Sequence, residues 1–383
     1  MHWLPDFDIA LLLTSMVKIV GLIFLVIMPM VAYSVYAERR VSAILQDRVG
    51  PNRVGIPLTN IRLAGLGQPI ADGLKFLLKE DLTPGHVRKL YYWMAPALVL
   101  IPALLTCAVL PFGSELNLFG HSVPLVIADL NVGPLFVFAI ASLSVYGIVL
   151  AGWSSNSKYP FLGGVRASSQ MISYEIALGL SIVPVLLLFG ELNLVQITRE
   201  QSQNGWLLLP ISFFGDGPVI EWKRLLFVIP AGIAFFVFMV AIFAETNRTP
   251  FDLPECETEL VAGYHTEYSS MKFALFFLGE YAAMIIGSGL AVTLFFGGWS
   301  LPFGIDQWII GLNDGMIPWW LGLLHMGVFF GKVVFFILFF IWVRWTVPRF
   351  RYDQLMKLGW VYMFEIALAN IFLAAGILLL FRA

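Results

Sequence analysis

The chain has 383 residues, of which 59% are hydrophobic and only 13% are charged, and its mean hydropathy is +0.84. These values exclude an ordinary soluble domain and favour a chain built for a lipid environment. The formal net charge of −2 indicates no particular class of partner.

Eight apolar blocks are long enough to cross a bilayer, which takes about 20 helical residues for a hydrocarbon core of roughly 30 Å. We therefore predict an all-α membrane protein with about eight transmembrane helices, folded as a single transmembrane domain over residues 1–383. The predicted spans are 9–33, 90–112, 133–153, 168–190, 225–245, 270–297, 318–343 and 360–381.

The loops between these spans form two alternating sets, and the Lys and Arg residues are concentrated in one set. With Lys272 counted in its adjacent loop, that set carries 17 of the 23 basic residues. Because short cytoplasmic loops carry the basic excess, we expect this set to be cytoplasmic and both termini to be external. The predicted cytoplasmic loops, which we expect to be structured, are 34–89, 154–167, 246–269 and 344–359.

The inner end of the first span leads into the sequence ERRVSAILQDRVGPNR. Its Gly-Pro-Asn triplet predicts a turn, so its charged residues stand on a shaped loop. An ordinary positive-inside anchor is the alternative, and we favour it for Arg40 and Arg53. The candidate functional residues of this loop are Glu38, Arg39 and Arg48.

Residues 58–80 show helical spacing of apolar side chains, with Asp72, Lys75 and Lys79 on the opposite face. The segment is too short to span a membrane, so we predict an amphipathic helix that lies in the interface. It could be a plain surface anchor, although Asp72 beside lipid requires a partner.

Residues 245–267 are the most informative segment, because carboxylates dominate where basic residues are expected. Six acidic residues occur there against one arginine, Arg248. A solvated acidic loop is the simple alternative, but interleaved apolar residues favour a segment folded back on the membrane domain. Like charges this close raise carboxylate pKa values, so these groups could share a proton near neutral pH. The acidic residues are Glu245, Asp252, Glu255, Glu257, Glu259 and Glu267.

Ionisable residues also occur inside the predicted spans. Glu175 lies nine residues beyond Arg166, which at 1.5 Å per helical residue is about 14 Å into the membrane. A carboxylate there is energetically costly and usually marks a path for ions or protons. Glu280, Lys332 and Glu365 also lie within later predicted spans, and any one of them could instead be a structural hydrogen-bond partner.

The sequence indicates no redox centre of its own and no metal site. Cys107 and Cys256 are too few and too far apart for an iron–sulfur cluster or a zinc site. His325 is the only histidine within a predicted span, which excludes a haem held between facing helices. No glycine-rich motif for a dinucleotide or for ATP occurs.

Several segments, in order along the chain, closely resemble the H subunit of NADH:quinone oxidoreductase, respiratory complex I. They are ERRVSAILQDRVGPNRVG, QPIADGLKFLLKED, RASSQMISYE, AETNRTPFDLPECETELVAGYHTEYSSMKFALFFLGEY and PRFRYDQLMKLGW. The resemblance covers nearly the whole chain except the 191–224 external loop. It implies a bacterial inner-membrane subunit that forms most of the tunnel for ubiquinone or menaquinone and couples quinone reduction to proton translocation.

The resemblance also implies roles for individual residues. The quinone-binding residues would be Glu38, Arg39, Arg48, Asp72, Lys75, Phe251, Arg344 and Arg349. The proton relay would comprise Glu175, Glu245, Asp252, Glu255, Glu257, Glu259, Glu267 and Glu280.

The same resemblance implies that quinone is a substrate and that no cofactor is bound by this chain alone. FMN and the iron–sulfur clusters would belong to partner subunits, namely the peripheral quinone module, beside small membrane subunits and antiporter-like subunits. Lipid is a further partner, and we expect none among nucleic acids.

Two other functions remain open at this stage. One is the homologous subunit of a membrane-bound hydrogenase or formate-oxidising complex, which handles no quinone. The other is a stand-alone proton or cation transporter, which would favour inverted repeats that we do not find.

Overall fold

The computed structural model describes residues 9–55, 64–118, 121–213, 222–312 and 317–381. In this part of the chain, eight helices are long and apolar enough to cross a membrane, which confirms the predicted all-α membrane fold. The eight spans are Thr14–Leu45, Lys89–Val109, Gly133–Ser154, Lys158–Phe189, Trp222–Glu245, Ser270–Phe295, Trp319–Thr346 and Tyr352–Leu380.

Several of these spans are built from consecutive helical pieces. The first joins α1 (Ile9–Val20), a π-helical segment (Gly21–Ile27) and α2 (Met28–Leu45). The others are α4 (Lys89–Thr106), α5 (Gly133–Ala141) with α6 (Leu143–Ser154), α7 (Lys158–Phe189), α9 (Trp222–Glu245), α11 (Ser270–Phe295), α13 (Trp319–Thr346), and α14 (Tyr352–Lys357) continued through a π-helical segment (Leu358–Met363) into α15 (Phe364–Leu380).

Short elements occupy the two ends of the bundle. One small antiparallel sheet is described, in which Glu115 pairs with Pro124. The short elements are α3 (Gln68–Leu78), α8 (Leu194–Asn204), α10 (Glu257–Leu260), α12 (Ile305–Leu312), the strands β1 (Glu115–Leu118) and β2 (His121–Pro124), and 3-10 turns at Cys107–Val109, Gly263–His265 and Pro302–Gly304.

Several spans extend further than their apolar blocks predicted, whereas the second and the sixth end earlier than predicted, at Val109 and Phe295. The first helix continues to Leu45 rather than ending before residue 34, and the fourth begins at Lys158 rather than at 168. The seventh span ends at Thr346 and the eighth begins at Tyr352, so the loop predicted over 344–359 is reduced to five residues. Hydropathy stops at the first charges, whereas a helix continues wherever its side chains find partners, so Glu38, Arg39 and Arg344 stand on helices.

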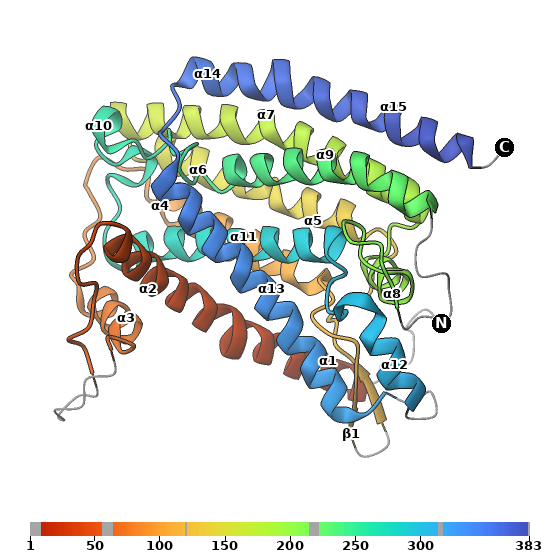
Figure 1. Cartoon of the computed structure of the whole chain (residues 1–383). Helices are drawn as coiled ribbons and strands as arrows, with labels where there is room; N and C mark the ends of the chain where they lie inside the picture. The colour runs from red at the N-terminus through yellow and green to blue at the C-terminus, as the bar shows by residue number, and fades with distance from the viewer. Residues whose placement is uncertain (1–8, 56–63, 119–120, 214–221, 313–316, 382–383) are drawn as a thin grey trace, which may run out of the picture.

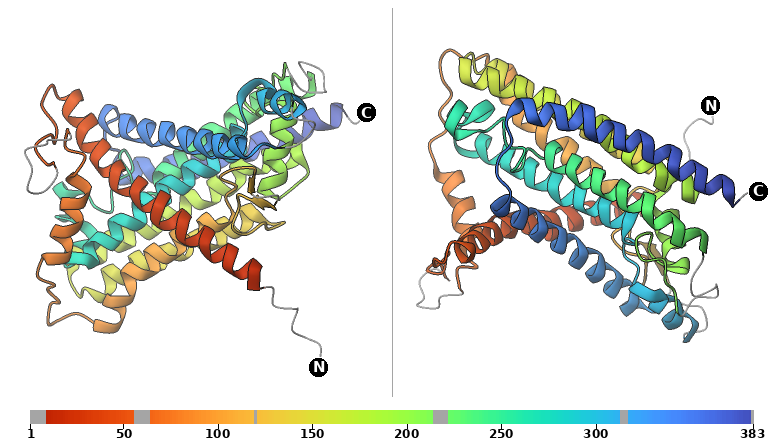
Figure 2. Two further views of the ribbon diagram at one scale, coloured as in Figure 1. Left: turned by 90° about the horizontal axis from the view of Figure 1, so that it is seen from below. Right: turned by 45° about the horizontal axis from the view of Figure 1, so that its top comes forward.

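The interfacial helix is also shorter than the predicted 58–80. Residues 58–63 lie outside the described residues, and α3 itself covers Gln68–Leu78. Gly65 just before it has a φ of +85°, a left-handed conformation that breaks helical geometry. Figure 2 shows α3 at the end of the bundle where α2 ends. Its apolar residues Ile70, Leu74 and Leu77 are exposed, as expected of a helix that lies against lipid or a partner.

Helix α11 is the centre of the bundle, because it contacts α2, α4, α9 and α13. Its span is also the most buried, at 67%. Small residues permit this packing: a Cβ added at Gly279 of α11 would meet Val99 of α4 at 2.8 Å, and one at Gly147 of α6 would meet Val99 at 2.6 Å. Such close approach of small residues is how helices associate in lipid.

The two ends of the bundle carry different short elements (Figure 1). One end carries α3, α10 and the C-terminal turns of α2 and α13, so we call it the cavity end. The opposite end carries α8, α12 and the small sheet, and α1 begins and α15 ends there.

Candidate functional site

A cavity of about 610 Å³ opens at the cavity end, where α2, α3, α11 and α13 converge. Its wall combines apolar side chains with eight ionisable ones, four of each sign. The charged residues of the wall are Glu38, Asp72, Glu255, Glu280, Arg39, Lys75, Arg248 and Arg344.

Glu38 on α2 is the hub of this wall. Its Oε2 accepts hydrogen bonds from the Tyr281 hydroxyl at 2.5 Å and from Nη1 of Arg248 at 3.3 Å. Its other oxygen, Oε1, accepts from Arg344 on α13. The carboxylate is buried, so these three donors replace the water that it loses.

Arg248 joins this hub to α11. Its Nε lies 2.8 Å from Glu280 Oε1, and its guanidinium stacks 4.0 Å from the centre of the Tyr281 ring. Burial lowers the pKa of Arg248, but the carboxylate of Glu280 outweighs it, with smaller contributions from Tyr281 and Glu255, so the pKa is raised. Arg248 is therefore a permanent positive charge between two buried acids.

Helix α3 contributes a second ion pair to the wall. Asp72 accepts a hydrogen bond at 2.8 Å from Arg39 of α2 and another at 3.1 Å from Gln68, one turn earlier. Arg39 is thus the charged partner that the sequence predicted for Asp72 beside lipid. Lys75 also lines the cavity and lies 4.7 Å from the centre of the Phe76 ring.

The acidic segment is folded back against the membrane helices, as its apolar residues indicated. The Nε2 of Gln170 on α7 donates to Ala244 O and Phe251 O at 2.8 Å and to Asn247 Oδ1 at 3.2 Å. Gln170 is fully buried, so the segment is fixed at its start from within the bundle. It is a structured loop at this point, and a fully solvated one would leave these groups exposed.

Glu255 is the acid of this segment that reaches the cavity wall. Burial raises its pKa well above the ordinary value, and the charges of Glu280 and Asp252 raise it further against the opposing effect of Arg248. The Tyr264 hydroxyl donates to Glu255 at 3.4 Å. His265 stands 3.7 Å away, and burial lowers its pKa to about 4, so it is neutral at pH 7.

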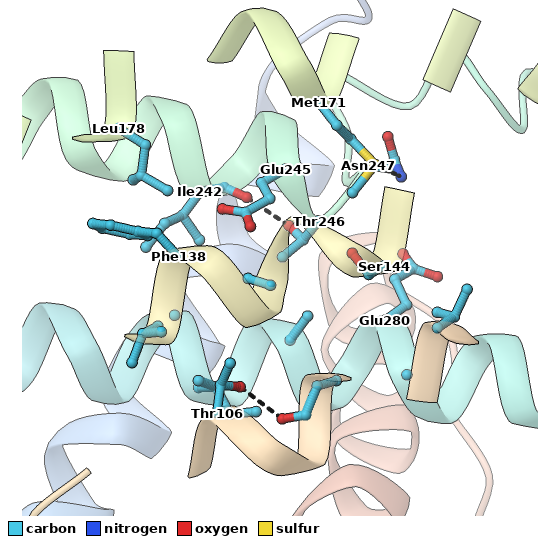
Figure 3. Close-up of a pocket in the computed structure, with 18 of the residues that line it drawn as sticks. Thr106, Phe138, Ser144, Met171, Leu178, Ile242, Glu245, Thr246, Asn247 and Glu280 are labelled. Atoms are coloured by element: carbon cyan, nitrogen blue, oxygen red, sulfur yellow. Dashed lines mark hydrogen bonds between the residues drawn. The ribbon is translucent and has the colours of Figure 1, made fainter. Parts of the chain in front are cut away.

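A smaller cavity of about 80 Å³ lies within the bundle (Figure 3). Glu280 borders both cavities, and Glu245 at the end of α9 borders the smaller one. Figure 3 shows both carboxylates among the residues that line this cavity, together with Ser144 and Thr246. Glu175 of α7 lies close enough to Glu245 for their charges to repel. Glu280 and Glu245 thus line the same small cavity, and Glu175 lies within electrostatic range of Glu245.

The remaining predicted site residues lie outside both cavities. Arg48 is exposed and donates to Gln46. Phe251 is buried against Tyr174 and Phe350, and Arg349 lies behind the wall, 2.8 Å from Asp252 and 3.1 Å from Cys256 Sγ.

Two other acids of the segment have peripheral positions. Glu259 is half exposed and pairs with Arg166 at 2.7 Å, while Glu267 contributes a backbone carbonyl to the Tyr92 hydroxyl. The side chain of Glu257 lies outside the described residues.

Two residues at the centre of the wall had no assigned role from the sequence. Arg248 was noted only as the single base among six acids, although that isolation could have indicated a buried partner. Tyr281 follows Glu280 directly within an apolar span, and a hydroxyl at that depth requires a hydrogen-bond partner.

The fold and the cavity define a polytopic helical membrane protein with a large ionisable pocket at one membrane face. The family model described as NADH dehydrogenase matches residues 17–375. The chain therefore belongs to the NADH dehydrogenase family, and the family resemblance seen in its motifs is confirmed.

Similar proteins cover almost the whole chain. The NADH-quinone oxidoreductase H subunit 1 from Cytophaga hutchinsonii is 44% identical over 95% of this chain and 96% of its own. The H subunit of the same enzyme from Salinibacter ruber is 48% identical over 90% of this chain and 91% of its own. The H subunit 1 from Geobacter metallireducens is 46% identical over 94% and 95%.

Proposed function

We propose that this chain is the membrane subunit of an NADH-quinone oxidoreductase and that the 610 Å³ cavity receives the quinone. The observation that carries the proposal is the set of contacts around Glu38 of α2. Its donors Arg248, Tyr281 and Arg344 come from distant parts of the chain, yet they meet it on the wall of one cavity. The family membership and the near full-length similarity to proteins named as H subunits of that enzyme support it.

The cavity suits a molecule with a polar head and an apolar tail. Its wall carries the eight charged residues, of which Arg39 and Lys75 are exposed, and it also includes Leu77 of α3, which is 65% exposed. An exposed apolar side chain on an interfacial helix gives a lipid-soluble quinone a route from the bilayer. The volume lies within the range of small-molecule pockets, which is about 300–1,000 Å³.

The charge of the wall suits the reduction of the quinone. With every wall residue ionised its four positive and four negative charges cancel, but the raised pKa of Glu255 favours a protonated acid there. A protonated Glu255 would leave the wall with one positive charge in excess. Because Coulomb interactions are poorly screened in a dry cavity, this excess favours negative charge arriving with electrons.

Reduction of one quinone to its quinol takes two electrons and two protons. We propose that the electrons come from iron–sulfur clusters, supplied through FMN, in partner subunits that cover the cavity end. This end would face the cytoplasm, with both termini on the periplasmic side, in agreement with the basic excess of the loops. Small membrane and antiporter-like subunits would be the partners within the membrane.

The protons have a path in the series Glu280, Glu245 and Glu175. Glu280 lines both the quinone cavity and the smaller cavity. Its protonation would therefore respond to charge in the quinone cavity and would change the electrostatic potential in the smaller cavity. Asp252 and Glu255 extend the series toward the peripheral face, and Glu259, Glu267 and Glu257 would lie at its margin. Coupled carboxylates of this kind change protonation together.

The first test is co-purification with activity. The tagged chain, extracted from its native membranes in mild detergent, should come out with iron–sulfur subunits that reduce quinone at the expense of NADH. A transporter would come out alone. A hydrogenase-type complex would come out with partners but would show no quinone reduction, and either result would contradict the proposal.

The second test uses two arginines of the last cytoplasmic segment as a matched pair. Arg344→Ala removes a donor to Glu38 on the cavity wall, whereas Arg351→Ala changes a side chain that is 81% exposed. A lost hydrogen bond to a charged group corresponds to about tenfold or more. We expect the quinone KM to rise by that factor in Arg344→Ala only. Ferricyanide reduction by the partner subunits that hold FMN and the iron–sulfur clusters should be unchanged in both variants. Equal losses in both variants would make Arg344 structural.

The proton series is tested by Glu280→Gln, with Glu365→Gln as the control because Glu365 is also in a span but is exposed. Glu280→Gln should uncouple quinone reduction from the proton gradient, and Glu365→Gln should not. A full gradient in Glu280→Gln would remove Glu280 from the path.

A further inference from the structure

A second polar cavity, of about 310 Å³, lies at the opposite end of the bundle from the quinone cavity. It is framed by α8, α12, the small sheet and residues between α11 and α13, which Figure 1 shows together at that end. We call it the outer vestibule. The polar residues of its wall are Ser114, Glu115, Arg199, Ser202, Gln203, Trp299 and Gln307.

Two wall hydroxyls each contact a buried ionisable side chain. The Ser202 hydroxyl donates to Asp306 Oδ2 at 2.6 Å and itself accepts from Gln307 Nε2 at 3.2 Å. The Ser114 hydroxyl lies 2.7 Å from Nδ1 of His325. Asp306 and His325 have no solvent-exposed surface, so each stands one hydroxyl behind the vestibule.

Among the described residues, three buried polar atoms on or just behind the wall of this vestibule have no hydrogen-bond partner. They are His325 Nε2, Trp299 Nε1 and Asp306 Oδ1. A buried donor or acceptor that is left unpaired is costly, and such atoms are usually satisfied by water where a polar cavity has room for it. The vestibule has that room, so its chemistry is that of a hydrated pocket.

Lys332 supplies a fixed positive charge beneath the vestibule. Its ammonium donates to the carbonyls of Phe296, Gly298 and Ser300 at 2.7–2.9 Å, at the C-terminal end of α11. All three of its protons are used, and the Trp206 ring lies 4.0 Å away. A neutral amine would turn a lone pair toward a carbonyl, so this geometry requires the cation.

The mouth of the vestibule has an ion pair. Arg199 lies 3.2 Å from Glu115, with the two side chains 50% and 33% exposed. This pair is reachable by bulk water and leads inward to the two serines. In the described part of the chain, the charged and titratable groups that face the vestibule or contact its wall are thus Glu115, Arg199, Asp306, His325, Lys332 and Lys18, whose ammonium donates to Val126 O at 3.3 Å.

We propose that the outer vestibule is a second proton-exchange site of this protein, with Asp306 as its proton acceptor on the face opposite the quinone cavity. A proton passes from a hydronium ion in the vestibule water to the Ser202 oxygen, which leaves a neutral water molecule, while the Ser202 proton passes to Asp306 Oδ2. One O–H bond forms and one breaks at the serine, so the hydroxyl is regenerated and no other reactant is needed.

The environment of Asp306 supports an exchangeable proton. Burial raises its pKa from the ordinary value, and this effect outweighs the lowering by the Ser202 hydroxyl, by the backbone amides of Asp306 and Leu301, and by Lys332. Asp306 would otherwise be a permanent anion that joins α12 to α8. The two possibilities differ in whether the carboxyl group titrates.

Infrared titration of the complex in lipid, without NADH or quinone, separates them. We expect a protonated-carboxyl band whose midpoint lies above the ordinary value of about 3.9, and which is absent in Asp306→Asn. Asp353→Asn, at a side chain that is 75% exposed, is the control and should retain the band. A band unchanged in Asp306→Asn would overturn the proposal.

Ser202→Ala retains the Asp306 carboxyl group, so it tests the proposal even if the Asp306→Asn variant does not fold. Loss of a donor to the ionised form should move the midpoint up by about one pH unit. An unmoved midpoint would contradict transfer through Ser202.

Water access is tested by Gln307→Cys and a membrane-impermeant cationic thiol reagent, since Cys107 and Cys256 are buried. Labelling should occur only from the membrane face opposite the quinone cavity. Labelling from the cavity face alone, or from neither, would refute the vestibule. None of these readouts needs quinone turnover, so their failure is distinct from failure of the proposed function.

Discussion

Replacement of Arg248 by Met should destabilise the cavity end strongly and in a pH-dependent way. The change leaves Glu38 with fewer donors and Glu280 without its cation at 2.8 Å. Breaking a buried ion pair from one side costs about 3–5 kcal/mol. The protein can limit this cost by taking up a proton on one acid, which from a reference pKa of about 4.3 to pH 7 costs about 3.7 kcal/mol.

The two estimates agree, so we expect a loss of about 3–4 kcal/mol at pH 7. The loss should decrease by about 1.4 kcal/mol for each pH unit below 7, because proton uptake becomes easier. Thermal denaturation of the purified complex at several pH values measures it. Arg248→Met combined with Glu280→Gln removes the unpaired acid and should recover more than half of the loss.

The double variant also provides the refutation. If Arg248→Met lowers stability by less than about 1 kcal/mol, or if its effect is independent of pH and adds to that of Glu280→Gln, then the buried charges are solvated in the assembled protein. The charged residues around Glu38 would then not be coupled electrostatically, so a change at one of them would not affect the others.

Three further predictions concern single residues. The buried His265 has a pKa lowered to about 4 from 6.5, so its contribution to stability is complete above pH 6.5 and is lost as the pH falls toward 4. His265→Phe should remove acid sensitivity in that window, as inactivation half-lives against pH would show. Gly263→Ala should impair assembly, because φ is +61° and the added Cβ would collide with the Pro254 carbonyl; normal yields on blue native gels would contradict this. Glu175→Gln should leave assembly intact but reduce quinone turnover or the proton gradient, and full values of both would exclude it from the path.

The sequence predicted the membrane architecture well, because the apolar blocks alone determine where helices can cross lipid. Helix ends were less predictable. Glu38, Arg39 and Arg344 read as loop residues, yet each is helical because its charge is paired with a partner that is more than 30 positions away. No local pattern contains that information.

The site was predicted in part, and the reason for the gaps differs from residue to residue. Glu38, Arg39, Asp72, Lys75 and Arg344 all reach the cavity wall, although their role there is a proposal. The resemblance to the family, and not any local pattern, identified these five residues together.

Other residues depended on packing that periodicity does not determine. Phe251 and Arg349 were expected at the cavity but lie behind its wall, because the acidic segment folds over and Arg349 is held there by Asp252 and Cys256. Tyr281 was overlooked because one hydroxyl scarcely changes the hydropathy of its span. The outer vestibule was overlooked because its serines and glutamines look like ordinary external loop residues.

The composition of the Glu38 hub also has a consequence for the order in which the protein is made. Its donors lie 210, 243 and 306 positions further along the chain, on the acidic segment, α11 and α13. Spans enter the membrane from the N-terminus onward, so Glu38 is inserted long before any of its partners exists. It must remain hydrated, or held by another protein, until the seventh span is in place. A chain truncated before residue 344 would therefore expose an unfinished acidic wall to the translocation and quality-control machinery, and the cavity is a product of late assembly.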